Sequence, residues 1–420
     1  MVRENANDER WQRERRAMLQ LALAHGLGPA GIGKLLEHCG GAVEVLAADE
    51  STWADALGCA RPRAGRCRTA AAAVDVASEE RATASHGGRL LAIGEPEYPS
   101  LLRAIPDPPP LLWMRGSFDP IDDWSIAIVG SRRCSVYGLD QAARFARGLA
   151  ERGHTIVSGG ARGIDAEAHR AALRAGGRTI AVLGTGLARP YPPEHSSLFD
   201  EIVAAGGVVL SEQPATMGPR PELFPRRNRI VSGLALGVLI VEARARSGAS
   251  ITARLAVEAH GREAMAVPGR VDSPTSEGAL RALREGWAAL VTSPEDVIEQ
   301  LASSSHLVRG ANDLAHGRAA HTHRAVGRTA GEAAPSVDWQ ALPPPVARVA
   351  RRIAAAGSLN VETAIDDDPV HEVLAAITTL EVLGLVRRDA EGVIHARTGL
   401  LSTAVSDACG RSTDRIGSPG

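Results

Sequence analysis

Lysine and net charge are almost absent from this chain of 420 residues. Lys34 is the only lysine, every other strongly basic residue is arginine, and the formal net charge is −2. A protein that binds nucleic acid over its whole surface carries a clear basic excess. This composition excludes such a protein, so any nucleic-acid site must be a local patch.

Cysteine, aromatic residues and long apolar runs are also scarce. The five cysteines form no CxxC pair, which argues against a zinc site and against a disulfide framework. No apolar run approaches the roughly 20 residues of a membrane span, and residues 1–16 are charged, without the apolar core of a signal peptide. We therefore expect a cytoplasmic protein with no membrane partner.

Familiar catalytic motifs are missing as well. The chain contains no GxSxG nucleophile, no HExxH metal motif and no GKT phosphate loop. Asp165, Glu167 and His169 lie close together on one expected helix, so an acid–base site is conceivable. The favoured alternative is that Asp165 caps the helix and His169 packs in the core. We expect no catalytic residue, no metal and no cofactor.

What the chain does contain is arginine in short clusters. The densest runs from Phe224 to Ile230 and includes Arg226, Arg227, Asn228 and Arg229. Arginine presents a rigid fork of donors that matches phosphate, and it stays charged. The segment predicts an anion-binding loop at a strand end, and a solvated basic turn is the alternative.

Two glycine-rich segments also carry arginine directly after expected strands. Gly130 and Ser131 precede Arg132, while Gly159 and Gly160 precede Arg162 and Gly163. Glycine lets the backbone approach an anion, and N–H groups at a helix start carry partial positive charge. Helix packing alone also explains a single glycine of this kind.

Short apolar runs alternate with helical segments between residues 125 and 301. This pattern predicts a doubly wound α/β fold with a mostly parallel sheet. Ligands of such sheets bind beyond the carboxyl ends of the strands, so the arginine clusters should converge on one rim. The expected strands are Ser125–Gly130, Thr155–Gly159, Thr179–Gly184, Val208–Glu212, Gly237–Glu242, Ala264–Pro268 and Ala288–Thr292.

Smaller modules flank this region. Residues 1–85 read as a helical module of the sterile-alpha-motif or helix-hairpin-helix kind, either touching DNA backbone or docking structurally. Gly28–Lys34 has P-loop spacing, but Leu35 replaces the required Ser or Thr and a helix precedes it. Residues 303–340 are expected to be a flexible linker and 398–420 a disordered tail.

Residues 341–397 have the pattern of a winged helix. Helices are expected at Pro345–Ala356, near Asn360–Asp366 and at His371–Leu385, followed by a β-hairpin up to His395. The second long helix lacks a basic face, so protein contact is slightly favoured over DNA binding for this module.

Taken together, the motifs resemble the DNA-processing protein A (DprA/Smf) family over residues 89–300. The resemblance is carried by Ile128–Arg132, Ser158–Asp165, Thr179–Gly186 with Tyr191-Pro192, Ser211-Glu212, Phe224–Ile230, Val241–Ala243, Ser247-Gly248 and Ala266–Gly269. The family's last motif departs here: Ala279 and Leu280 follow Gly278 where asparagine is usual, and Trp287 follows Gly286 where alanine is usual.

The resemblance implies an extended Rossmann-like domain at residues 86–302 that binds single-stranded DNA. It implies a dimer through that domain and transfer of the strand to the RecA recombinase during natural transformation, without catalysis. The implied DNA-binding residues are Gly130, Ser131, Arg132, Gly159, Gly160, Arg162, Gly163, Arg226, Arg227, Asn228, Arg229, Ser247 and Gly248. The alternative is a nucleotide phosphoribohydrolase of the lysine-decarboxylase-like Rossmann group.

Overall fold

A computed structural model describes most of the chain. The described residues are 2–245, 247–302, 344–356, 358–360, 373, 380, 386–388 and 393–396. The predicted linker (303–340) and tail (398–420) lie outside them. The chain divides into two compact units, residues 1–325 and 326–420, and each is considered by itself.

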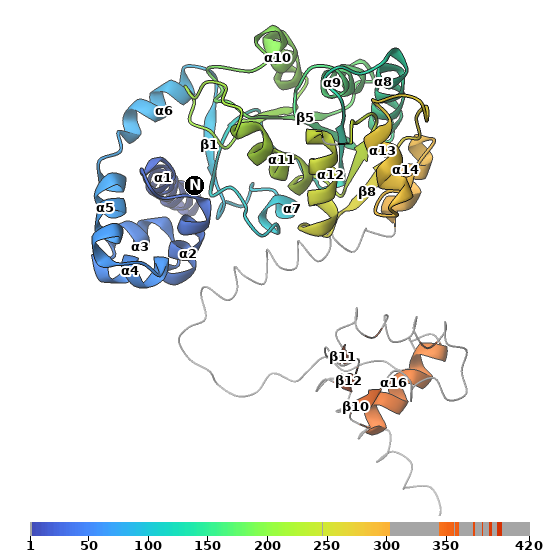
Figure 1. Cartoon of the computed structure of the whole chain (residues 1–420). Helices are drawn as coiled ribbons and strands as arrows, with labels where there is room; N and C mark the ends of the chain where they lie inside the picture. The colour runs from blue at the N-terminus through green and yellow to red at the C-terminus, as the bar shows by residue number, and fades with distance from the viewer. Residues whose placement is uncertain are drawn as a thin grey trace, which may run out of the picture. The chain divides into compact units, whose positions relative to one another are not determined.

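A nine-stranded sheet forms the centre of the first unit (Figure 1). Its strands run in the order β1-β2-β6-β5-β4-β3-β7-β8-β9, parallel from β6 to β9, with β2 antiparallel to both β1 and β6. The bounds are β1 Arg89–Ala92, β2 Leu111–Arg115, β3 Ser125–Val129, β4 Thr155–Ser158, β5 Thr179–Leu183, β6 Val208–Ser211, β7 Gly237–Ile240, β8 Glu263–Ala266 and β9 Ala289–Leu290.

Helices cover both faces of this sheet. Along β3, Ile126 and Ile128 pack in the core beneath α8 and α9, while Ala127 and Val129 face the core beneath α11 and α12. The helices are α7 Ser100–Arg103, α8 Val136–Ala150, α9 Ile164–Arg174, α10 Ser196–Ala204, α11 Leu223–Gly233, α12 Gly248–Glu258, α13 Glu277–Arg284 and α14 Pro294–Ala302, with 3-10 turns η1 Pro120–Trp124 and η2 Pro193–His195. The doubly wound, mostly parallel sheet is therefore confirmed.

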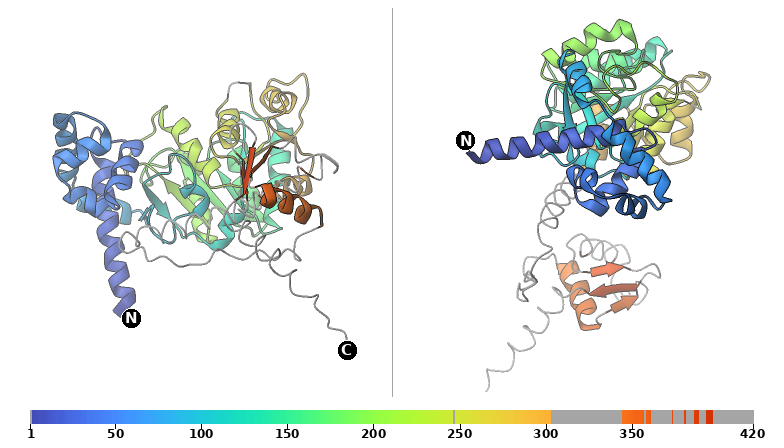
Figure 2. Two further views of the ribbon diagram at one scale, coloured as in Figure 1. Left: turned by 90° about the horizontal axis from the view of Figure 1, so that it is seen from below. Right: turned by 90° about the vertical axis from the view of Figure 1, so that its left-hand side faces the viewer.

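Six helices precede the sheet: α1 Val2–Leu23, α2 Pro29–Cys39, α3 Ala42–Ala47, α4 Glu50–Leu57, α5 Arg61–Ala72 and α6 Val76–Ala84. The amino end of α1 extends past the others (Figure 2). Buried Trp53 and Leu35 belong to the same core as Leu90 and Trp113 of the sheet edge. The indole of Trp113 also donates to Glu79 of α6 at 2.8 Å. These helices are thus packed onto the sheet, and their likeness to a sterile alpha motif or helix-hairpin-helix stays a prediction.

Three local expectations change. Residues 111–115 form β2, which we did not predict, because prolines precede it and it lies beside an edge. The Gly28–Lys34 segment is mostly helix α2, which begins at Pro29 and so holds no phosphate loop. Phe224–Ile230, predicted as a loop, lie within helix α11 (Leu223–Gly233).

In the second unit, α16 (Pro344–Ala356) matches the predicted helix. Strands β10 (Ser358–Asn360), β12 (Val393–Ala396) and β11 (Val386–Arg388) form an antiparallel sheet in that order. Asn360 therefore lies in a strand, where a short helix was expected to start. The remaining predicted helices fall largely outside the described residues, so the winged helix stays a prediction.

None of the helices in the described part of the chain combines the length and apolar character that a membrane span requires.

Candidate nucleic-acid interface

The loops that follow β3, β4, β5 and β6 meet in one pocket at the carboxyl edge of the sheet. These strands are consecutive neighbours and parallel, so their loops share an edge. The cavity has a volume of about 20 Å³, room for about one water molecule. It is lined by Arg132, Gly159, Ala161, Arg162, Tyr191, Pro192, Phe224 and Arg227. The two glycine-rich loops and the α11 cluster therefore do converge.

Two arginines enclose a pair of aromatic rings in this pocket. The guanidinium of Arg132 lies 5.4 Å from the ring centroid of Phe224, and that of Arg162 lies 5.6 Å from the centroid of Tyr191. The two rings are 5.6 Å apart and tilted by 58°. Such cation–π contacts hold the planar guanidinium groups in place without using their donors. We did not include either aromatic residue among the site residues, although both stand in the motifs quoted above.

The two arginines differ in their partners. Arg132 is exposed and forms no ion pair within the described residues. Arg162 pairs through Nε with Glu194 at 2.5 Å, and both side chains are about half exposed (48% and 49%). Their hydrogen bond raises the pKa of Arg162 and lowers the pKa of Glu194. Arg132 is therefore open to an anion, whereas Nε of Arg162 is already engaged by Glu194.

Helix α11 divides the predicted arginine cluster between surface and interior. Arg226 is exposed, whereas Arg227 and Arg229 are only 7% and 8% exposed. Arg227 donates to the carbonyls of Gly159 and Val182, and Arg229 pairs with Glu212 and Asp107. The prediction of an anion-binding loop is thus wrong about the local structure. The segment is a core-facing helix, and two of its guanidinium groups bind oxygen atoms of the protein itself.

Gly159 lies directly above Arg227. A Cβ atom at Gly159 would come within 2.6 Å of Nη2 of Arg227. Burial lowers the pKa of Arg227 to about 10, opposed by the nearby Asp165. The guanidinium nevertheless stays charged at neutral pH, and it forms a cationic floor beneath the glycine loop.

Asp165 was predicted to cap α9, and this prediction is wrong. Gly163 is the N-cap residue, and Asp165 is buried within the first turn, where its Oδ2 accepts from the backbone N–H of Ala161 at 3.3 Å. Burial raises the pKa of Asp165, while the charge of Arg227 opposes that shift. Asp165 therefore holds the β4 loop and balances the charge of Arg227.

His169 packs in the core, as favoured. Its Nδ1 lies 2.7 Å from the hydroxyl of Thr179, which itself donates to the carbonyl of Ile156. The hydroxyl must then accept from His169, so Nδ1 carries the proton. Burial lowers the pKa of His169 to about 3, while Glu167 pairs with Arg174. These three residues do not form an acid–base site.

The two glycine-rich loops are joined at Ser131. Its carbonyl accepts from the N–H of Ile164 at 3.3 Å. Gly163 has a φ of +76°, and a Cβ there would lie 2.3 Å from the same carbonyl oxygen, so only glycine fits. Arg132 and Arg162 are consequently positioned by one connected backbone.

Ser247 and Gly248 lie at the start of α12, outside the lining of this pocket. Ser247 is the N-cap residue, and its hydroxyl accepts from Ser250 N. The amide of Asn228 approaches the carbonyl of Gly248 at 3.4 Å, a long contact between α11 and α12.

Comparison with known proteins supplies the family. The profile described as DNA recombination-mediator protein A matches residues 89–302, just over half of the chain. The chain belongs to this family. Its identity to Protein Smf of Escherichia coli is 46% over 209 residues, which is 50% of this chain and 55% of that protein. To the DNA processing protein DprA of Streptococcus pneumoniae it is 44% over 203 residues, 48% of this chain and 71% of the relative.

A solved structure of DNA processing protein A from Streptococcus pneumoniae is also similar. It has 36% identity and a TM-score of 0.61, covering 68% of this chain and 97% of that one. The sequence match spans just over half of the Escherichia coli relative's length. The resemblance over residues 89–300 is thus confirmed.

The departure from the family's last motif lies at α13. Gly278 donates its N–H to the carbonyl of Ala243 at 2.7 Å, and a Cβ at Gly278 would lie 2.8 Å from that oxygen. Trp287 lies beneath the guanidinium of Arg254 at 5.8 Å. Gly278 thus keeps a close backbone contact beside β7. The substituted residues lie outside the lining of the pocket that contains Arg132 and Arg162, called the arginine pocket below.

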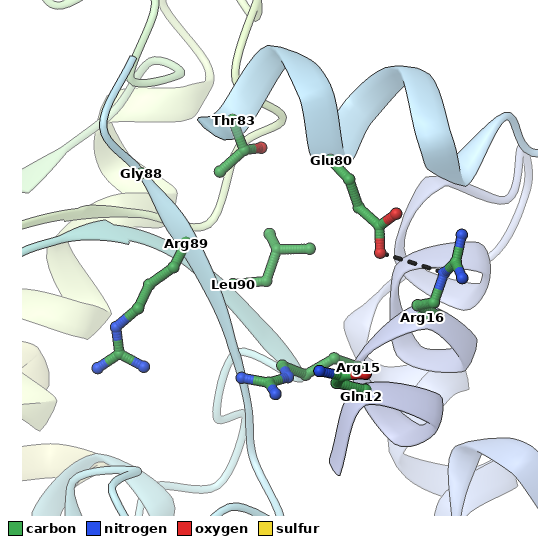
Figure 3. Close-up of a pocket in the computed structure, with 8 residues that line it drawn as sticks. All are labelled: Gln12, Arg15, Arg16, Glu80, Thr83, Gly88, Arg89 and Leu90. Atoms are coloured by element: carbon green, nitrogen blue, oxygen red, sulfur yellow. Dashed lines mark ion pairs between the residues drawn. The ribbon is translucent and has the colours of Figure 1, made fainter. Parts of the chain in front are cut away.

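A larger pocket lies mostly before the region matched by the family. Its volume is about 300 Å³, and it lies where α1, α6 and β1 meet, lined by Gln12, Arg15, Arg16, Glu80, Thr83, Gly88, Arg89 and Leu90 (Figure 3). Each arginine here faces a carboxylate: Arg16–Glu80 at 3.2 Å, Arg15–Glu95 at 3.5 Å and Arg89–Glu97 at 2.5 Å. This balanced charge suits a junction between elements better than a phosphate site.

Proposed function

We propose that the domain at residues 86–302 binds single-stranded DNA in the arginine pocket. One observation carries this proposal: two arginines stack on adjacent aromatic rings at the carboxyl edge of the sheet, above the buried cation of Arg227. A contact with a ring face uses no N–H donor, so the donors of Arg132 stay available for the bidentate contacts that phosphate favours.

The predicted site residues take different roles in this proposal. Arg132 and the exposed Arg226 contact phosphate directly, and Arg162 does so after leaving Glu194. Backbone groups at Gly130, Ser131, Gly159, Gly160 and Gly163 shape the loops that approach the strand. Arg227 and Arg229 act from below, because their donors already bind protein oxygens. Asn228, Ser247 and Gly248 support the junction of α11 with α12.

Single-strand preference follows from the shape of the site. The phosphate donors lie among closely spaced loops around a small cavity, which a flexible backbone follows more easily than a stiff duplex. Phosphate contacts also make affinity fall with salt, by about 0.7 log units per log unit of salt for each contact on single strands.

The wider role proposed is that of a recombination mediator. We infer that the protein protects single-stranded DNA and hands it to the RecA recombinase during natural transformation, without chemical catalysis. The family's description as a recombination mediator supports this inference. We infer a homodimer through the same domain, with the helical module, linker and winged helix attached to it. The edge strand β9, where Leu290 is 58% exposed, is a candidate contact for that dimer.

Hydrolysis of a nucleotide remains the competing function. A cavity of about 20 Å³ is much smaller than a nucleobase, and His169 and Asp165 are engaged in the core. Release of free base from AMP by purified protein would support the enzyme instead.

The proposed function is tested by titrating labelled oligo-dT and a blunt duplex of equal length at two salt concentrations. We expect tighter binding of oligo-dT at both, with affinity falling steeply as salt rises. Equal affinities at matched salt would contradict the proposal.

A further inference from the structure

The centre of the sheet contains a position that other folds of this class use for ligands. Strands β3 and β7 are parallel neighbours, yet α8 after β3 and α12 after β7 pack on opposite faces. In doubly wound sheets, ligands bind where connections diverge in this way, with phosphate at the amino end of the first helix. Here that helix is α8.

A side chain of the protein occupies this position. Glu242 follows β7 and is only 2% exposed. Its carboxylate accepts from the N–H of Ser135 at 2.8 Å, from the hydroxyl of Ser135 at 2.6 Å and from the hydroxyl of Thr275 at 3.1 Å. Ser135 is the N-cap residue of α8, so a carboxylate stands at the amino end of that helix.

The surroundings of Glu242 fit a carboxylate. All three of these donors to Glu242 are neutral, and the start of α8 adds partial positive charge. Gly138, in the first turn of α8, leaves the necessary room, because a Cβ there would lie 2.4 Å from Oε2 of Glu242.

Glu242 is also linked directly to the loop that carries Arg132. The N–H of Ser131 donates to the backbone carbonyl of Glu242 at 2.7 Å. The residues between Ser131 and Ser135 are therefore held at both ends by Glu242, once through its backbone and once through its carboxylate. Through Thr275 the same carboxylate reaches the loop between β8 and α13.

We propose that Glu242 is a positioning residue for DNA binding, whose carboxylate fixes the Arg132 loop and fills the place of a nucleotide phosphate. This inference rests on the proposed function and adds a residue that touches no DNA. It assigns phosphate contact to the arginine pocket, because the helix terminus beside it is already satisfied.

The test replaces the carboxylate and then supplies one in solution. Glu242→Ala should weaken oligo-dT binding at least tenfold, because the Arg132 loop loses its second anchor. Sodium formate should restore part of that affinity relative to sodium chloride at equal ionic strength, since formate fits the vacated space. Glu258→Ala, at an exposed position of α12, is the control and should bind like the native protein in both salts.

Native oligo-dT affinity of folded Glu242→Ala would overturn the proposal, and so would a loss that formate does not restore. If Glu242→Ala fails to fold, Glu242→Gln decides. Its amide group replaces one acceptor by a donor facing other donors, so we expect weaker binding, and native affinity would overturn the proposal.

A thermal measurement separates this inference from the proposed function. Should the native protein not bind oligo-dT at all, the function falls, yet formate should still raise the melting temperature of Glu242→Ala more than chloride does. An equal effect of the two salts would overturn the role of the carboxylate.

Discussion

Replacement of Arg227 by methionine should destabilise the domain strongly, although its neighbour Arg226 tolerates the same change. Arg227 is 7% exposed and donates to the carbonyls of Gly159 and Val182. Methionine leaves those carbonyls without their donor and leaves buried Asp165 without its nearby cation. Breaking a buried charge arrangement by removing one partner costs about 3–5 kcal/mol. At 2–4 °C per kcal/mol, this lowers the melting temperature by roughly 6–20 °C.

The matched variant is Arg226→Met, one residue away on α11. Arg226 is exposed and has no ion pair within the described residues. Its replacement should change stability by less than about 0.5 kcal/mol, as for ordinary surface positions. It should instead make the salt dependence of oligo-dT binding shallower by about 0.7, the share of one phosphate contact.

Thermal unfolding and salt-dependent titration of both variants test this division. An Arg227→Met protein that melts like the native one, and loses only salt dependence, would refute the assignment of Arg227 to the interior of the site.

Three further outcomes are expected. His169 has a native pKa of about 3 against about 6.5 in the unfolded chain. Protonation therefore favours the unfolded state, and the free energy of unfolding falls as the pH drops below about 6.5. By pH 5 the loss is about 2 kcal/mol, and pH-dependent denaturation of His169→Gln should lack it; equal pH profiles would contradict this. Glu194→Gln should bind oligo-dT several-fold more tightly at low salt, because Arg162 loses its ion pair with Glu194. Glu201→Gln on α10 should not bind more tightly. Unchanged affinity of Glu194→Gln would argue against competition between Glu194 and DNA for Arg162. In chemical denaturation, Gly163→Ala should lower the free energy of unfolding by about 1–3 kcal/mol more than Gly176→Ala does. Gly176 has a similar positive φ but open space around it. Equal losses would show that the close contact with Ser131 contributes nothing to the effect.

Much of the sheet could be predicted from sequence because its strands are buried on both faces. Runs such as Ile126–Val129 are continuously apolar, and helical segments alternate with them. The convergence of the glycine loops followed from the same topology. Strand β2 was missed because the prolines before it indicate turns and because it lies next to the edge strand of the sheet.

The division of labour within the arginine cluster could not be predicted. Arg226 and Arg227 are adjacent and chemically identical, and only the rotation of α11 decides which one is buried. The roles of Tyr191 and Phe224 depend on contacts with Arg162 and Arg132 across different loops. Partners of this kind depend on tertiary packing and leave no periodic signal.

The proposed contact of Arg132 with the phosphate of single-stranded DNA is tested by one pair of variants. The dissociation constant for oligo-dT is measured across a range of salt concentrations for the native protein, Arg132→Ala and Arg133→Ala. Both arginines are exposed neighbours, but only Arg132 lines the pocket. We expect weaker binding and a log–log salt slope shallower by about 0.7 for Arg132→Ala alone. An unchanged slope in Arg132→Ala, or equal changes in both variants, would contradict it.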